Sequence, residues 1–172
     1  MQTLFIKKLV LHSDFSPSGR NAPSKNDIAL IQFYPSERSG RCVIFDQDKQ
    51  PACLPRQSDR FDESSTCHVS GWGDTETNER GIQYSSRLQI ARLHLDDFAQ
   101  CQADFERRGH IHLDCGKHMC ASAETSDSCL GDSGGPLVCH RRCDQVTLVG
   151  VVSFGIGCNG DLPGLSNAFN HN

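Results

Sequence analysis

The feature that most constrains the fold of this chain is the shortness of its apolar segments. Runs of three to five mostly apolar residues alternate with turns, and 15 glycines and 7 prolines lie mainly between these runs. Short apolar runs bounded by turn residues predict β-strands, and a series of such strands indicates a β-barrel or a β-sandwich. We therefore expect an all-β protein. The expected strands are residues 9–11, 28–31, 42–45, 66–69, 88–91, 136–139 and 148–152.

One segment, from Asp96 to Phe105, has the pattern of a helix. Asp96 is a residue type that caps helix N-termini, and Phe98 and Cys101 contribute to an apolar side. We expect Asp96 to cap this helix. The polar stretch from Gln57 to Ser65 is the expected boundary between two domains.

Ten of the 172 residues are cysteines. This density indicates disulfide bonds and an oxidising compartment, so we expect a secreted, extracellular protein. The first eleven residues, interrupted by Lys7 and Lys8, do not form a signal peptide, and no apolar run is long enough to span a membrane. These observations predict a fragment whose true N-terminus lies upstream. The net charge of −4, without a long basic block, argues against nucleic acid as a partner.

The segment Gly131–Pro136 reads Gly-Asp-Ser-Gly-Gly-Pro and has the composition of a turn that carries a nucleophile. A serine hydroxyl becomes an effective nucleophile when a base removes its proton and donors stabilise the developing oxyanion. Flanking glycines let the backbone turn tightly and direct N–H groups toward one point. The N–H groups of Gly131 and Ser133 are the candidate donors. Taken alone, the segment also fits an ordinary glycine-rich turn.

Four further segments favour the nucleophile interpretation over an ordinary turn, because of the order in which they occur along the chain. With the segment around Ser133 they are residues 26–30 (Asn-Asp-Ile-Ala-Leu), 51–55 (Pro-Ala-Cys-Leu-Pro), 70–75 (Ser-Gly-Trp-Gly-Asp-Thr), 127–139 and 151–155 (Val-Val-Ser-Phe-Gly). Together these segments resemble the chymotrypsin/trypsin family of serine proteases, and the resemblance covers nearly the whole chain. The Gly-Trp-Gly-Asp-Thr form and the upstream Cys42 resemble neurotrypsin-like mosaic proteases in particular.

The resemblance implies an all-β, trypsin-like double Greek-key β-barrel fold. The C-terminal barrel, with the nucleophile and the substrate pocket, would be nearly complete over residues 63–172. Residues 1–55 would be a remnant of the N-terminal barrel, and residues 56–62 the linker between the two. An open half-barrel exposes strand edges and apolar faces. In the family the chain continues into a strand and a final helix, whereas residues 166–172 are expected to be an unrelated tail.

The resemblance also implies an acyl-enzyme mechanism that cleaves peptide bonds after Arg or Lys. Ser133 would attack the scissile carbonyl, and Asp27 would orient a catalytic histidine and stabilise its imidazolium. Asp132 would receive the ammonium group that zymogen cleavage creates. The remaining substrate-binding residues implied are Asp127 at the floor of the pocket, Gly155 and Gly164 as its walls, and Ser128, Ser153 and Phe154. The resemblance implies no cofactor and no metal.

The catalytic histidine of this family is not recognisable in the chain. The family places it in an Ala-Ala-His-Cys segment, and none of the eight histidines has that context. His12, in a strand and turn before Asp27, is the alternative base. Two explanations compete: a fragment of an active protease, or a catalytically dead homologue that acts as a binding or regulatory module. In either case we expect the 172-residue chain alone to be inactive.

The resemblance pairs six of the ten cysteines as Cys67–Cys139, Cys101–Cys120 and Cys129–Cys158. Cys53 matches a position that tethers the protease domain to an upstream propeptide or mosaic domains. Cys42, Cys115 and Cys143 have no standard partner, although Cys115 and Cys143 could join two surface loops. A competing interpretation concerns residues 110–120, which contain five potential zinc ligands. In that interpretation the chain is a metal-binding module.

Overall fold

A computed structural model describes residues 2–19, 23–35, 40, 42–74, 83–123, 130–140 and 145–155, and the backbone of residues 167–170. Several residues singled out in the sequence lie outside this part of the chain. They are Asp127, Ser128, Cys129, Cys143, Cys158 and Gly164.

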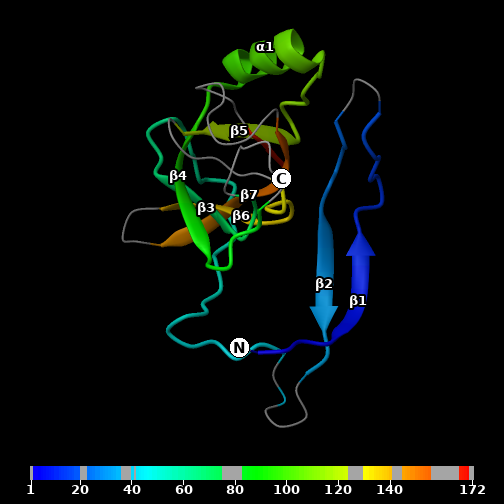
Figure 1. The fold of residues 1–172 in the computed structure, drawn as a ribbon, viewed down its shortest axis with the longest axis vertical. Helices are drawn as coiled ribbons and strands as arrows, with labels where there is room; N and C mark the ends of the chain where they lie inside the picture. The colour runs from blue at the N-terminus through cyan, green and yellow to red at the C-terminus, as the bar shows by residue number, and fades with distance from the viewer. Residues whose placement is uncertain are drawn as a thin grey trace.

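The described chain forms a two-stranded sheet and a closed six-stranded barrel (Figure 1). All strand pairs within the two sheets are antiparallel, which confirms the all-β prediction. The two-stranded sheet consists of β1 (Ile6–Leu11) and β2 (Ala29–Phe33). The barrel follows the order β3 (Cys67–Gly71), β4 (Gln89–Leu95), β5 (His118–Ser122), β8 (Asn167–Asn170), β7 (Val146–Gly155) and β6 (Pro136–His140).

The barrel encloses the main core of the protein. Side chains alternate along β3, where Cys67 and Val69 are buried, as expected for strands with one face toward a core. The disulfide Cys67–Cys139 lies within this core, because the two residues face each other across β3 and β6. The other buried members of this core are Leu93, Leu95, Ala121, Leu137, Val149 and Val152.

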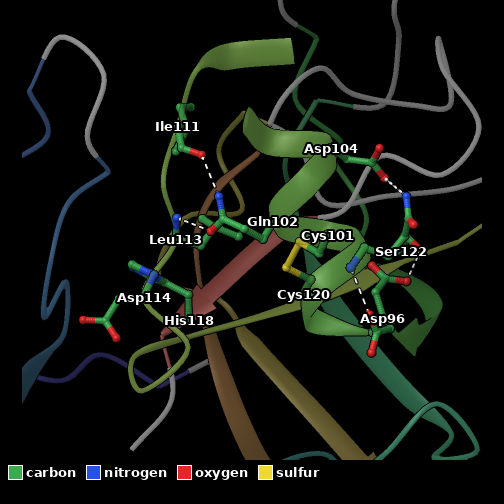
Figure 2. Close-up of a disulfide and its surroundings, with 12 residues drawn as sticks. Asp96, Cys101, Gln102, Asp104, Ile111, Leu113, Asp114, His118, Cys120 and Ser122 are labelled. Carbon is green, nitrogen blue, oxygen red and sulfur yellow. Dashed lines mark hydrogen bonds between the residues drawn. A yellow bond between two sulfur atoms is a disulfide. The ribbon is translucent and has the colours of Figure 1, made fainter. Parts of the chain in front are cut away.

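Helix α1 (Phe98–Gly109) packs on the outside of the barrel over β5 (Figure 1). The disulfide Cys101–Cys120 joins the helix to that strand (Figure 2). Phe105 and Leu113 complete a second buried cluster around it. The structure thus contains two of the three cysteine pairs implied by the resemblance. The third, Cys129–Cys158, lies outside the described residues.

The predicted cap of this helix is wrong by one residue. The helix begins at Phe98, and the Asp97 side chain accepts a hydrogen bond from the Gln100 N–H (2.9 Å). Asp96 continues the strand path after β4 instead, because its N–H donates to the Cys120 carbonyl (3.0 Å). Its carboxylate accepts a hydrogen bond from the Ser122 hydroxyl (2.7 Å), as Figure 2 shows.

The prediction that residues 166–172 form an unrelated tail is also wrong. Residues 167–170 form β8, which pairs with β5 on one side and β7 on the other and thereby closes the barrel. Conversely, residues 42–45 form no strand. The nearest β-type pairing is an isolated bridge between Asp46 and Lys49. No described strand lies beside residues 42–45 to form a ladder of backbone hydrogen bonds with them.

The β1–β2 sheet stands beside the barrel (Figure 1), and most of its side chains are exposed. Leu9, Leu11 and Ile31 are each at least 50% exposed, although they are apolar. This agrees with the apolar exposure expected of an open half-barrel, while the division at residues 55 and 63 stays a prediction. Within the described residues, no helix has both the length and the apolar character needed to cross a membrane.

Candidate active site

Ser133 occupies the outer corner of a tight turn. The Gly135 N–H donates to the Asp132 carbonyl (2.8 Å), which closes a turn with Ser133 and Gly134 at its centre. Gly134 has a φ of 81°, the value that the third residue of a type II turn requires and that glycine adopts without strain. The Gly134 N–H donates to the Val152 carbonyl (2.9 Å), so the turn is anchored on β7. The turn exposes the Ser133 side chain.

The carboxylate of Asp132 points away from the turn into a space made by two glycines. Its Oδ1 accepts a hydrogen bond from the Gly73 N–H (2.8 Å). A Cβ built on Gly71 or on Gly73 would overlap this carboxylate. The sequence showed these glycines only as part of the segment around Trp72. Their contact with Asp132, 59 residues away from Gly73, emerges only in the folded chain.

Asp27 is half-buried at the start of β2 and is held by its own local backbone. The preceding residue, Asn26, has a φ of 51°, a left-handed conformation that asparagine tolerates better than most residues. The Asn26 amide donates to the Asp14 carbonyl (2.8 Å), and the Asn26 carbonyl accepts a hydrogen bond from the Ile28 N–H (2.9 Å). This buried asparagine therefore fixes the direction in which the chain enters Asp27.

The carboxylate of Asp27 also contacts the barrel directly. The Ser153 hydroxyl, on β7, donates to Asp27 Oδ2 (2.8 Å). The sequence analysis assigned Ser153 to substrate binding, and the structure adds this contact with Asp27. No local pattern could have indicated it, because the two residues are 126 positions apart.

Asp27 and Ser133 line one cavity of about 420 Å³ between the β1–β2 sheet and the barrel. The sheet contributes Leu11 and Ile31, and β7 contributes Val151. The cavity therefore combines apolar walls with a carboxylate and a hydroxyl. The structure thus brings to one cavity, from distant parts of the chain, the two residues whose side chains were predicted from the sequence to act in catalysis.

None of the described histidines is among the residues that line this cavity. His12 is the nearest along the chain, since its N–H donates to the Ile28 carbonyl (3.2 Å). It follows Leu11, which lines the cavity, and successive side chains of a strand point to opposite faces. The His12 ring turns back on its own loop, where Nδ1 accepts a hydrogen bond from the Asp14 N–H (3.1 Å).

Only some of the predicted substrate-binding residues fall within the described chain. Gly155 is exposed at the end of β7. Phe154 is half-buried, and its ring meets Phe105 and His118 edge to face, each at 5.6 Å between centroids. The positions of Asp127, Ser128 and Gly164 lie outside the described residues.

The zinc interpretation of residues 110–120 finds no support in the arrangement of their side chains. Cys120 is in a disulfide, and both ring nitrogens of His118 contact backbone atoms. Among the described residues, no three of the usual ligand types converge on one point. Cys42, Cys53 and Cys115 carry free thiols, and Cys53 is half-buried beside β7, where it accepts a hydrogen bond from the Gln145 amide (3.0 Å).

A family model described as Trypsin matches residues 1–171 of this chain. The match includes the β1–β2 sheet, every strand of the barrel and the segments that carry Asp27 and Ser133. It also includes β8, the segment that the sequence analysis took for an unrelated tail.

Proposed function

The chain belongs to the trypsin family of serine proteases, and on that premise we propose that it is the catalytic domain of a secreted serine endopeptidase. The observation that carries the proposal is the shared cavity, which both Asp27 and Ser133 line. Ser133 Oγ attacks the scissile carbonyl carbon, and the resulting oxyanion is stabilised by the N–H groups of Gly131 and Ser133. The amine leaves with a proton, and water then hydrolyses the acyl-enzyme.

A base must take the Ser133 proton and return it to the leaving amine. In this mechanism the base is an imidazole that donates its other N–H to the Asp27 carboxylate, which stabilises the imidazolium. The Ser153 hydroxyl supports the proposal because it holds that carboxylate at one edge of the cavity. None of the described histidines lines the cavity, so the described part of the chain supplies no histidine to act as this base.

The substrate class is a protein or peptide with Arg or Lys before the cleaved bond. Asp127 carries this part of the proposal, since a carboxylate at the floor of a pocket pairs with a guanidinium or ammonium group. Gly155 and Gly164 leave room for a long side chain. The two disulfides and the family support an extracellular location. The neurotrypsin-like subtype and a tether through Cys53 remain predictions.

Binding of an amidine tests the specificity without requiring turnover. Benzamidine, a flat cation of the size of an Arg head group, should bind the chain, and the Asp127→Ser variant should lose most of that affinity. Asp48→Asn is the matched control for charge, because it removes an exposed carboxylate outside the site while leaving Asp127 in place. Equal affinity of the wild-type chain and Asp127→Ser would contradict the specificity for Arg and Lys.

A catalytically dead homologue that binds proteins is the second candidate, and it is favoured because no histidine of the described part of the chain lines the cavity. The two candidates differ in one measurement. In the presence of added imidazole, an organophosphorus probe of active serines should modify Ser133 if the chain is a catalytic domain, and should leave Ser133 unmodified if it only binds proteins.

A further inference from the structure

We propose that His118 is a positioning residue for Asp27, which holds the segment from Ser24 to Asp27 against the barrel through a neutral imidazole protonated on Nε2. The geometry of this contact stands on its own. Only its consequence for reactivity rests on the role proposed above for Asp27.

A tight turn sets the direction of the His118 ring. The Asp114 carbonyl accepts hydrogen bonds from the N–H groups of Lys117 (2.9 Å) and His118 (2.8 Å), and its carboxylate accepts one from Gly116 (3.0 Å). Gln102 of α1 fixes the approach to this turn, because its side-chain oxygen accepts a hydrogen bond from the Leu113 N–H (2.7 Å), as Figure 2 shows. These hydrogen bonds fix the segment that leads into β5, and with it the backbone of His118.

The hydrogen bonds of the ring define its tautomer. Nδ1 accepts a hydrogen bond from the Asp114 N–H (3.0 Å), so Nδ1 carries no proton. The proton of the neutral ring is then on Nε2, which lies 3.3 Å from the Ser24 carbonyl oxygen. A backbone carbonyl only accepts hydrogen bonds, so Nε2–H must be the donor.

Within the described residues, this contact and a second one attach the same short segment to the barrel. His118 holds Ser24 from β5, and Ser153 holds Asp27, three residues later, from β7. The two anchors are mechanically linked, because the His118 ring packs edge to face on Phe154, the neighbour of Ser153. Asn26, buried between the two attachment points, removes further freedom from the segment.

Packing alone does not account for a histidine here. The side chain is 1% exposed and lies against Phe154, where an apolar residue of similar volume would avoid the cost of burying two polar nitrogens. That cost is offset when both nitrogens are hydrogen-bonded. The arrangement therefore indicates that His118 is needed at this position for the hydrogen bond that its Nε2–H donates to the Ser24 carbonyl.

Two conservative variants separate the two nitrogens. His118→Gln places an amide nitrogen where Nε2 lies, and so keeps the donor to Ser24. His118→Asn is shorter, keeps an acceptor near the Asp114 N–H and does not reach Ser24. We measure amide hydrogen exchange in residues 23–29, where the N–H groups of Lys25 and Ile28 are hydrogen-bonded and report on the segment. Exchange in residues 98–109 of α1 is the control for the fold.

Exchange in residues 23–29 should be about tenfold faster in His118→Asn than in the wild-type chain, the effect expected from loss of one hydrogen bond. In His118→Gln it should stay close to the wild-type rate, and α1 should exchange equally in both variants. Equal exchange of the segment in the two variants would overturn the proposal. A second test is nitrogen NMR of the His118 ring in the wild-type chain, which shows which ring nitrogen carries the proton. A proton on Nδ1 would also overturn the proposal.

Reactivity is tested separately. In the presence of added imidazole, Ser133 of His118→Asn should react with an organophosphorus probe several-fold more slowly than Ser133 of His118→Gln. If Ser133 reacts in no form of the protein, the proposed function fails while the exchange and NMR results still decide the role of His118. If Ser133 reacts equally in both variants, His118 does not position Asp27.

Discussion

At the scale of single residues, the hydroxyl of Ser153 makes a clear contribution to the stability of the fold, because it donates a hydrogen bond to the Asp27 carboxylate. Ser153→Ala removes the donor to Asp27 Oδ2 and leaves a half-buried carboxylate with one hydrogen bond fewer. We expect the free energy of unfolding to fall by about 1.5–3 kcal/mol, the range for hydrogen bonds to charged groups. Urea denaturation measures this. Ser153→Thr keeps the hydroxyl and serves as the control, and equal midpoints for the two variants would show that the bond contributes nothing.

The sequence predicted the residues that carry the chemistry, but it did not indicate the residues that hold them in place. Ser133 and Asp27 were predicted from the resemblance of their segments to the trypsin family, and their catalytic roles stay predictions. The contact of Ser153 with Asp27 joins positions 126 residues apart, and the contact of His118 with Ser24 joins positions 94 apart. Such contacts depend on the barrel being closed, so no local pattern indicates them.

At the scale of secondary-structure elements, β3 and β6 bring two histidines together. The rings of His68 and His140 meet edge to face, with centroids 5.2 Å apart. Burial, and then the charges of His140 and Arg92, lower the pKa of His68 below its ordinary value of 6.5. The unfolded chain therefore takes up a proton at this site at a higher pH than the folded chain does. As pH falls below 6.5, this site makes the fold less stable, until the folded form is also protonated.

Replacing His140 with Gln tests this coupling between the two strands. The variant removes one of the two neighbouring charges, so the pKa of His68 should rise toward its ordinary value, and the pH dependence of stability contributed by His68 should weaken. Proton NMR titration of the His68 ring measures the shift. Arg92→Gln should produce a smaller rise, because the charge of Arg92 has the weaker effect. A His68 titration unchanged by His140→Gln would contradict the interaction.

Element boundaries were the weakest part of the sequence prediction. Six of the seven expected apolar runs overlap strands, namely β1, β2, β3, β4, β6 and β7, but β5 and β8 were missed entirely. The sequence of β8, Asn-Ala-Phe-Asn, contains two residues that disfavour strands, and it pairs because β5 and β7 offer open edges on both sides. The tertiary context of the barrel thus decides the structure of these four residues. Residues 42–45 show the reverse, with strand-like residues and no partner.

At the scale of the whole molecule, the two disulfides close loops of very different length. Cys67 and Cys139 are 72 residues apart, whereas Cys101 and Cys120 are 19 apart. Chain-entropy arguments give about 4 kcal/mol for the longer loop and about 3 kcal/mol for the shorter. The double variant Cys67→Ala/Cys139→Ala should therefore unfold at a lower urea concentration than Cys101→Ala/Cys120→Ala. The opposite order would show that packing of α1, rather than the constraint on the unfolded chain, dominates.

The activity of the whole chain depends on whether any part of it supplies a base to the cavity. No described histidine lines the space between Asp27 and Ser133, so the 172-residue chain should react with an organophosphorus probe no faster than its Ser133→Ala variant. Added imidazole offers a ring that accepts the Ser133 proton and donates to Asp27, and it should raise the labelling rate of Ser133. Asp27→Asn should lose most of that gain. Rapid labelling without imidazole that disappears in His12→Ala would show instead that His12 reaches the cavity and that the chain carries its own base.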